Sequence, residues 1–309
     1  DSINVDSTFE SRRQYRELLF KTKDLSNFIS GVILFDETIR QNTGEGISFS
    51  EFLTKNDIIP GIKVDSGAVA ISYESQEKVT EGLDGLNERL KEYKLMGALF
   101  TKWRAIIDID IEKKIPSNYN LELNAFSLAR YAKIVQNNNL VPIVEPEVLM
   151  DGNHSIDSCF EITKKTLSKV FKELERHDVF LKGILLKPNM VISGNTSSKK
   201  STIEEVGNMT VKCLKETVPE DVPGIVFLSG GQSNEIATEH LNFMNKNFKN
   251  LPWKLSFSYG RALQQPSLSI WKGDEKNVEK SQSALYLRGY LNSQATLGEY
   301  SSQDENKAL

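Results

Sequence analysis

Short apolar runs alternate with longer amphipathic segments along most of the chain. The apolar runs are rich in valine, isoleucine and leucine and end at glycine, proline or charged residues. This pattern is typical of buried strands. Strands are predicted for residues 31–35, 59–64, 103–108, 141–149, 183–187, 224–229 and 254–260.

The segments between these runs repeat their apolar residues with the 3.6-residue period of an amphipathic helix. In residues 156–177 the apolar stripe consists of Ile156, Phe160, Thr163, Leu167, Val170, Phe171 and Leu174. Helices are predicted for residues 7–20, 83–97, 122–136, 156–177, 203–217, 236–248 and 277–295.

Alternating strands and helices predict an α/β fold with a parallel sheet. No linker or repeat divides the chain, so residues 1–309 are expected to form a single domain. A TIM (β/α)8 barrel fits this pattern and length, but it needs an eighth strand. We expect that first strand to lie upstream of residue 1.

Composition and charge exclude several classes of function. The chain has 38 basic and 42 acidic residues, a net charge of -4, which favours neither nucleic acid nor an anionic membrane. No apolar run is long enough to span a bilayer, and the start does not resemble a targeting signal. Cys159 and Cys213 have no C-x-x-C spacing, which favours a reducing, cytoplasmic location.

Polar residues recur near the carboxyl ends of the predicted strands, which is the active-site face of an α/β barrel. They are Lys63, Lys102, Arg104, Glu145, Glu147, Lys187, Ser229, Gly230, Gly231, Ser258 and Arg261. Lys102 and Arg104 fit least well, because they lie at the start of the predicted 103–108 strand rather than at its end.

Two pairs have the i, i+2 spacing that places both side chains on one face of a strand. Glu145 and Glu147 form one pair, and Lys102 and Arg104 form the other. Neighbouring carboxylates separate their pKa values, so one can act as an acid while the other stays ionised. Lys187 follows an apolar run, where burial and a nearby cation such as Lys102 would lower its pKa and make it a nucleophile toward a ketone.

The segment "FLSGGQS" offers the hydroxyl of Ser229 and the backbone N–H groups of Gly230 and Gly231 to an anion. Barrel enzymes often bind phosphate at the loops after their last two strands, and Arg261 would add a guanidinium there. Lys63 and Arg104 could bind a second phosphate.

Purely structural roles compete with these catalytic and phosphate-binding roles. A strand-end lysine, arginine or glutamate often serves only in a salt bridge, and "SGG" alone is often a plain turn. His154, His177 and His240 have no ligand spacing, so surface or helix-cap positions are expected for them. No metal site and no cofactor are proposed.

Several motifs resemble those of the class I fructose-1,6-bisphosphate aldolases, the Schiff-base enzymes of glycolysis. They are "SRRQYRELLF", "GVILFDET", "PGIKVD", "EGLDGLNER", "KWRA", "LARYAKIVQNNNLVPIVEPEVL", "LLKPNMV", "FLSGGQS" and "FSYGRALQ", in family order over most of residues 8 to 300. The phrases "FISGVILFDET" and "NDIIPGIKVD" look closest to protozoan members.

The resemblance implies reversible cleavage of fructose 1,6-bisphosphate to dihydroxyacetone phosphate and glyceraldehyde 3-phosphate. Lys187 then resembles the Schiff-base lysine and Glu145 the acid and base, with Glu147 and Lys102 as electrostatic partners. Substrate phosphates would be bound by Ser229, Gly230, Gly231, Ser258 and Arg261 at one end and by Lys63 and Arg104 at the other. Family members also carry a first-strand aspartate and a C-terminal tyrosine tail, which we expect outside residues 1–309.

Two other functions stay open at this point. A transaldolase-like barrel would use the lysine but would need no second phosphate site. A scaffold that binds actin or acidic cytoplasmic tails through the active-site cleft would need no chemistry at all. The resemblance also implies a homotetramer.

Overall fold

The computed structural model describes residues 3 and 5–306. Its main sheet has seven parallel strands in the order β1-β2-β5-β6-β7-β8-β9. Their bounds are Gly31–Leu34 (β1), Ile59–Lys63 (β2), Phe100–Ile107 (β5), Val141–Val148 (β6), Leu185–Leu186 (β7), Gly224–Phe227 (β8) and Lys254–Phe257 (β9). The seven predicted strands and the α/β class are therefore confirmed.

Ten α-helices lie within the described residues. They are α1 (Phe9–Phe20), α2 (Asp36–Ile39), α3 (Phe49–Lys55), α4 (Leu86–Leu95), α5 (Asn118–Asn137), α6 (Ile156–Arg176), α7 (Ile203–Thr217), α8 (Asn234–Asn247), α9 (Arg261–Trp271) and α10 (Val278–Leu297). The seven predicted helices are confirmed. The prediction missed α2 and α3, which are short, and α9, which contains Pro266.

The prediction also missed an antiparallel hairpin, β3 (Gly67–Ala70) and β4 (Lys78–Glu81). Four 3₁₀ helices complete the described structure, at Leu25–Asn27, Leu181–Gly183, Glu275–Asn277 and Ser302–Asn306. The second of these takes up Gly183, which was predicted to begin a strand.

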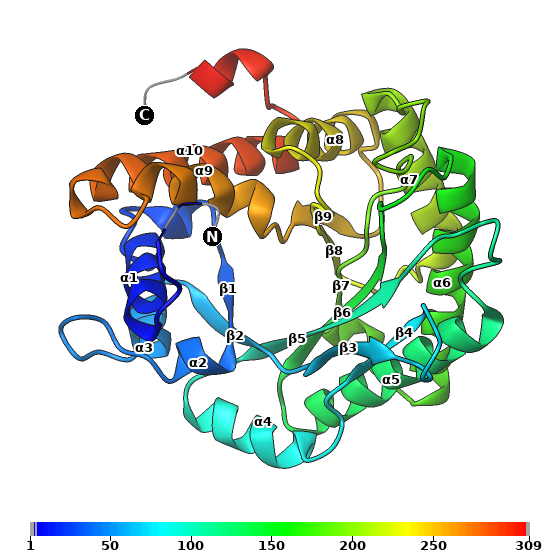
Figure 1. Cartoon of the computed structure of the whole chain (residues 1–309), viewed down its shortest axis with the longest axis horizontal. Coiled ribbons are helices and arrows are strands. Elements are labelled where there is room, and N and C mark those ends of the chain that lie inside the picture. Colours follow the sequence, from blue (N-terminus) through cyan, green and yellow to red (C-terminus); the bar gives the residue numbers. More distant parts are fainter. Residues whose placement is uncertain (1–2, 4, 307–309) are drawn as a thin grey trace.

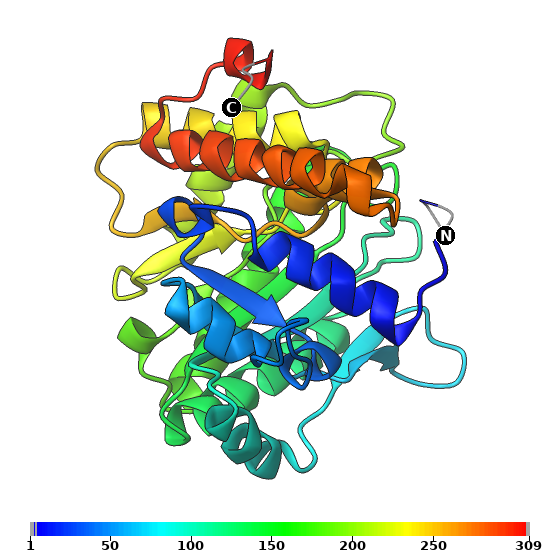
Figure 2. The ribbon, with the colours of Figure 1, turned by 90° about the vertical axis from the view of Figure 1, so that its left-hand side faces the viewer.

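The seven strands curl around a centre, and the longer helices cover their outer side, as in a TIM barrel (Figure 1). Figure 2 shows α1 and α10 passing one above the other on the side where β1 forms an edge of the sheet. Within residues 3 and 5–306 no strand pairs with the outer edge of β1 or of β9. This part of the chain therefore forms seven strands of the expected barrel.

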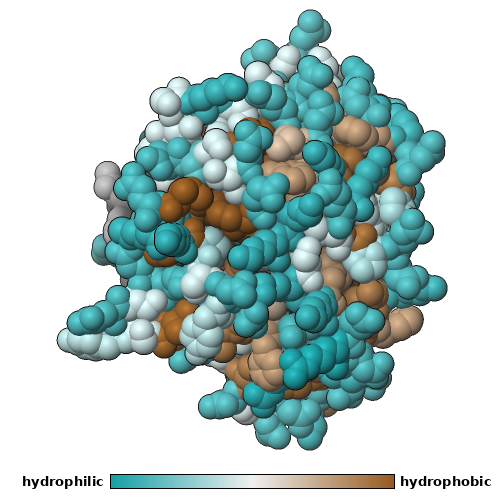
Figure 3. Space-filling view, turned by 90° about the vertical axis from the view of Figure 1, so that its right-hand side faces the viewer, coloured by the Kyte–Doolittle hydropathy of each residue, from teal (hydrophilic) through white to brown (hydrophobic). Residues whose placement is uncertain are grey.

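A continuous cluster of buried apolar side chains joins the sheet to its helices. The predicted stripe of α6 faces this core, with Ile156 half-buried and the other members buried. Trp103 on β5 and Tyr131 on α5 are fully buried and pack with their ring centroids 5.3 Å apart. The outer helices present a largely hydrophilic surface with separate apolar areas (Figure 3).

Two of the three histidine expectations were wrong. His154 and His240 are buried rather than at the surface, because the loop after β6 and the inner face of α8 pack against neighbouring segments. Burial lowers the pKa of His240 to about 4, so it is neutral at physiological pH. His177 caps the C-terminus of α6 as expected.

Within the described residues, no helix is long and apolar enough to cross a membrane. Cys159 and Cys213 are both free and buried.

Candidate active site

Strands β5 and β6 hold the two predicted charge pairs side by side. Strand β5 begins at Phe100 rather than at residue 103, so Lys102 and Arg104 lie within the strand and not at its start. The strand begins earlier because Phe100 pairs with Gly61, where a Cβ atom would stand 2.3 Å from the phenyl ring. Arg104 is in register with Glu145, and parallel pairing turns their side chains to the same face.

Glu145 lies between two ammonium groups. Its Oε2 is 3.2 Å from the Nζ of Lys102, and its Oε1 is 3.2 Å from the Nζ of Lys187. All three side chains are at least nine-tenths buried. The structure thus brings together three of the four predicted catalytic residues from three adjacent strands.

Lys187 follows β7 directly, and its backbone N–H still donates to the carbonyl of Val144 on β6. This bond directs the side chain into the curl of the sheet. Burial lowers the pKa of Lys187, and the charge of Lys102 lowers it further, against the opposing effect of Glu145. Lys187 therefore gives up its proton more readily than an exposed lysine, as the sequence predicted.

Glu147 pairs with Arg104 instead of with either lysine. The glutamate is buried, whereas the guanidinium of Arg104 is 43% exposed. Burial raises the pKa of Glu147 even though Arg104 opposes that shift. Burial thus favours the protonated form of Glu147.

The sequence interpretation missed Asp65, which lies two residues beyond β2. Its Oδ1 is 2.6 Å from the Nζ of Lys63, and its Oδ2 is 3.6 Å from the Nζ of Lys102. It also accepts a hydrogen bond of 3.2 Å from the backbone N–H of Arg104. The i, i+2 rule applied to Lys63 in "KVD" could have found it.

The loop after β8 has the backbone shape expected of an anion-binding turn. Gly230 and Gly231 have φ angles of +60° and +93°, a region that residues with a Cβ atom rarely adopt. A Cβ atom on Gly231 would stand 3.5 Å from a guanidinium nitrogen of Arg261, the first residue of α9. The structure therefore brings Arg261 beside the loop that also contains the buried Ser229.

Two backbone bonds tie this loop to its neighbours. The N–H of Leu228 donates to the carbonyl of Pro188, which follows Lys187, and the N–H of Ser258 donates to the carbonyl of Phe227. The Ser229 segment is thereby held at the strand end next to Lys187, with Ser258 on its other side.

Lys63 and Arg104, the predicted second phosphate site, already have carboxylate partners, Asp65 and Glu147. Both cations remain at the surface, with 25% and 43% of their side chains exposed. No group of three or more histidine, cysteine, aspartate or glutamate residues suited to a metal ion occurs in the described part of the chain. The arrangement offers a buried amine, three carboxyl groups and a loop for an anion, which suits covalent chemistry on a phosphorylated ketone.

Comparison with known proteins points to one family. A family model described as class I fructose-bisphosphate aldolase, a glycolytic group, matches residues 1–309. A probable class 1 fructose-bisphosphate aldolase of Xanthomonas axonopodis is 52% identical over 97% of this chain and 89% of its own length. The fructose-bisphosphate aldolase of Plasmodium falciparum is 51% identical over 97% of this chain and 81% of its own length.

A solved structure matches equally well. Fructose-bisphosphate aldolase from Plasmodium falciparum, in a ternary complex with TRAP and a small-molecule inhibitor, superposes with a TM-score of 0.96 at 50% identity. The match covers 98% of this chain and 87% of that one.

Proposed function

The chain belongs to the class I fructose-bisphosphate aldolase family, and we propose that Lys187 is the amine through which it cleaves its substrate. The reaction is the reversible aldol cleavage of fructose 1,6-bisphosphate to dihydroxyacetone phosphate and glyceraldehyde 3-phosphate, so the protein is a lyase. The observation that carries the proposed residue is the position of Lys187: buried, and in contact with Glu145, which also contacts Lys102.

Covalent bond formation begins with the neutral amine. The Nζ of Lys187 attacks the C2 carbonyl carbon, and the carbonyl oxygen takes up a proton to give a carbinolamine. Glu145 then protonates the departing hydroxyl group, which leaves as water, and a protonated Schiff base remains. The ammonium of Lys102, 3.2 Å from Glu145, stabilises the carboxylate that this step produces.

The positively charged Schiff base then draws the electrons of the C3–C4 bond toward nitrogen. A carboxylate takes the proton of the C4 hydroxyl group, and Glu145 is ionised at this stage and available for it. Cleavage releases glyceraldehyde 3-phosphate and leaves an enamine, which gains a proton at C3. Hydrolysis then frees dihydroxyacetone phosphate and Lys187.

The two phosphates need separate sites. We assign the C1 phosphate to Ser229, Gly230, Gly231, Ser258 and Arg261, because backbone bonds hold this loop next to Lys187 and the exposed guanidinium of Arg261 lies beside Gly231. We assign the other phosphate to Lys63 and Arg104. Replacing both with methionine should raise the KM for fructose 1,6-bisphosphate far more than for fructose 1-phosphate, and equal changes would contradict this assignment.

Trapping the intermediate tests the proposed lysine. Borohydride adds hydride to a Schiff base and converts it to a stable secondary amine, so dihydroxyacetone phosphate should become fixed to the peptide that contains "GILLKPNM". Mass spectrometry should place the adduct on Lys187. An adduct on another lysine, or none in folded protein, would overturn the proposal.

A peptide partner is a second candidate role. The related Plasmodium falciparum structure is described as a complex with TRAP. In this chain the cationic groups of Lys63, Arg104 and Arg261 lie partly exposed at strand ends and could bind an acidic tail or actin. Fructose 1,6-bisphosphate should then compete with an acidic peptide, and binding unaffected by the substrate would place such a partner elsewhere.

The homotetramer, the cytoplasmic location and the single-domain organisation also remain proposals. Light scattering of the native protein should give four times the mass of the chain, and any smaller particle would contradict the tetramer. One cooperative unfolding transition followed by two probes would support a single domain.

A further inference from the structure

Five charged side chains of alternating sign follow one another across the strand ends. Each lies within 3.6 Å of the next. In order they are Lys63, Asp65, Lys102, Glu145 and Lys187. We name this set the strand-end chain. Four of its members match residues singled out from the sequence, and Asp65 is the member without an assigned role.

Asp65 is held in the site by burial and by specific contacts. Its side chain is only 3% exposed, less than that of any other member. Both carboxylate oxygens are used, because Oδ1 contacts Lys63 while Oδ2 contacts Lys102 and accepts the N–H of Arg104. A buried carboxylate in such a place costs free energy unless it is paired, and here its partners are the site's own cations.

We propose that Asp65 is a positioning residue, which shares the ammonium of Lys102 with Glu145 and so limits how strongly that charge acts on Lys187. Lys102 lies within 3.6 Å of both carboxylates. With Asp65 ionised, the ammonium of Lys102 is attracted to two carboxylates instead of one, and its field at Lys187 is partly offset. Without that negative charge, the whole field would act on Lys187 and on the substrate.

The direction of the effect follows from the charges. A cation near Lys187 disfavours its ammonium form, and Lys102 already lowers the pKa of Lys187. Neutralising Asp65 should therefore lower that pKa further. Lys102 would also lose a restraint on its position beside Glu145, so the dehydration step should slow. A purely structural defect would slow catalysis without moving the pH profile.

Among the described residues, the charged groups that face Asp65 and Lys187 all lie at the carboxyl ends of the strands. Lys63, Lys102 and Arg104 face Asp65, and Glu145 and Glu147 face Lys187 together with Lys102. The phenol of Tyr131 on α5 packs behind them, and burial raises its pKa, so it stays neutral. No histidine is among these groups.

This inference rests on the proposed role of Lys187, and the test separates the two. In Asp65→Asn the amide keeps the shape of the side chain and can still accept the N–H of Arg104. Borohydride trapping with dihydroxyacetone phosphate is measured against pH for wild type and variant. Trapping should decline at low pH because Lys187 becomes protonated, and we call this decline the acid limb. In Asp65→Asn we expect the acid limb to move to lower pH by about half a unit to one unit. Cleavage at pH 7 should fall at least tenfold.

Asp108→Asn is the matched control, because Asp108 is a half-buried carboxyl group just beyond β5 and outside the strand-end chain. It should leave the acid limb in place. A second control places Asp65→Asn in a Lys102→Met background. If Asp65 acts through Lys102, most of the shift should disappear there, leaving only the smaller direct effect of the charge of Asp65.

Each outcome has a definite meaning. Failure to trap wild-type protein would overturn the proposed function itself. Trapping of wild type together with an unmoved acid limb in folded Asp65→Asn would overturn only the role of Asp65. A shift of undiminished size in the Lys102→Met background would also overturn it, because Asp65 would then act on Lys187 only directly. A variant that does not fold is replaced by Asp65→Glu, which should keep the wild-type limb because it keeps the charge.

Discussion

Two runs of five side chains with alternating charge lie in the described part of the protein, one at the strand ends and one along helix α1. The strand-end chain runs from Lys63 to Lys187. The second, which we name the α1 chain, consists of Glu10, Arg13, Glu17, Lys21 and Glu45. Each has five members, and in both the charged atoms are in ion-pair contact.

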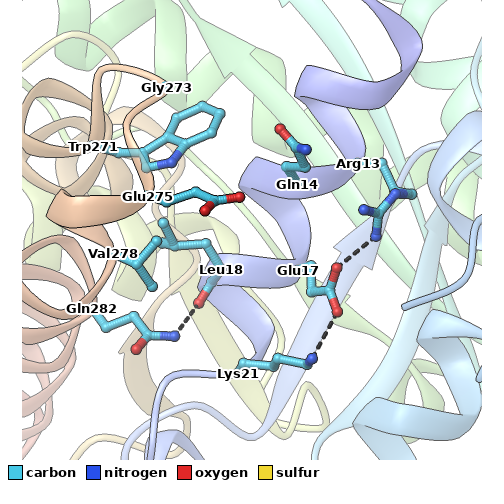
Figure 4. A pocket seen from close by; sticks show the side chains of 10 residues that line it. All are labelled: Arg13, Gln14, Glu17, Leu18, Lys21, Trp271, Gly273, Glu275, Val278 and Gln282. Carbon is cyan, nitrogen blue, oxygen red and sulfur yellow. Dashed lines mark hydrogen bonds and ion pairs between the residues drawn. The ribbon is translucent and has the colours of Figure 1, made fainter. Parts of the chain in front are cut away.

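The two chains differ in exposure. At the strand ends, the three inner side chains are 3 to 9% exposed, and Lys187 is 10% exposed. In the α1 chain the terminal glutamates are 55% and 62% exposed. Helix α1 forms a groove of about 260 Å³ with the segment from Trp271 to Gln282. Figure 4 shows Arg13, Glu17 and Lys21 at one side of this groove.

The same pattern of charges therefore serves different ends. In the α1 chain, burial raises the pKa of Glu17, but hydrogen bonds from Lys21, the backbone N–H of Gly44 and Arg13 outweigh it and lower that pKa to about 2, so the group stays ionised. At the strand ends, burial lowers the pKa of Lys187 and makes an amine available for reaction. Ion pairs near water keep their members in the charged form, whereas burial away from water disfavours the charged form of a group such as Lys187.

Lys187→Met should produce the largest loss. Without the amine no Schiff base forms, and cleavage should fall at least about a thousandfold. Thermal unfolding should show equal or higher stability, because a buried ammonium is replaced by an apolar chain. Cleavage at the wild-type rate would show that the strand-end chain is only structural.

The pH dependence of stability gives the same variant a second readout. The folded protein releases the proton of Lys187 more easily than the unfolded chain does, for which the ordinary value is 10.5. Wild type should therefore gain stability as pH rises from the lowered pKa toward 10.5. Lys187→Met should lack this gain in urea titrations.

Glu145→Gln should produce the second-largest loss of cleavage. The amide cannot protonate the carbinolamine, so cleavage should fall about a hundredfold to ten-thousandfold. Lys102 and Lys187 would also lose the anion between them, and the free energy of unfolding should fall by about 3 kcal/mol or more. Single-turnover kinetics and urea unfolding measure the two effects. An unchanged stability would mean that the two lysines need no shared anion.

Arg104→Met tests an intermediate case, in which a half-exposed cation pairs with a buried carboxylate. Glu147 would lose its partner, and stability at pH 7 should fall by about 1 to 3 kcal/mol. The loss should shrink at lower pH, because burial already raises the pKa of Glu147 and its protonated form needs no cation. A loss that stays constant with pH would contradict this account.

Glu17→Gln should have the smallest effect. Pairs of this kind contribute at most about 1 kcal/mol, and the loss should vanish in 1 M salt. The contribution of Glu17 should be complete above its unfolded pKa and disappear as pH falls through that value toward about 2. Cleavage should be unaffected, and a slower enzyme would show that the α1 chain reaches the active site.

The hydrophobic pattern predicted the strands well because parallel strands buried on both faces need continuous apolar runs. It missed α9 because Pro266 interrupts the helical pattern, and it missed the β3–β4 hairpin because its residues are mostly exposed and carry little periodic signal. The site residues were found largely because their i, i+2 spacing fixes which face of a strand they occupy. Asp65 has the same spacing from Lys63, so its place on that face follows from the sequence, but its contact with Lys102 on another strand does not.

The sequence by itself determined the order of strands and helices, the face of β5 and β6 that carries charge, and the family. These follow from local periodicity and from residue types at fixed spacing. Only the tertiary structure decided that Glu145 contacts both lysines, that Asp65 joins them, and that Glu147 pairs with Arg104 instead. These contacts join residues far apart in the sequence, and which pairs form depends on strand register and burial, which no local pattern contains.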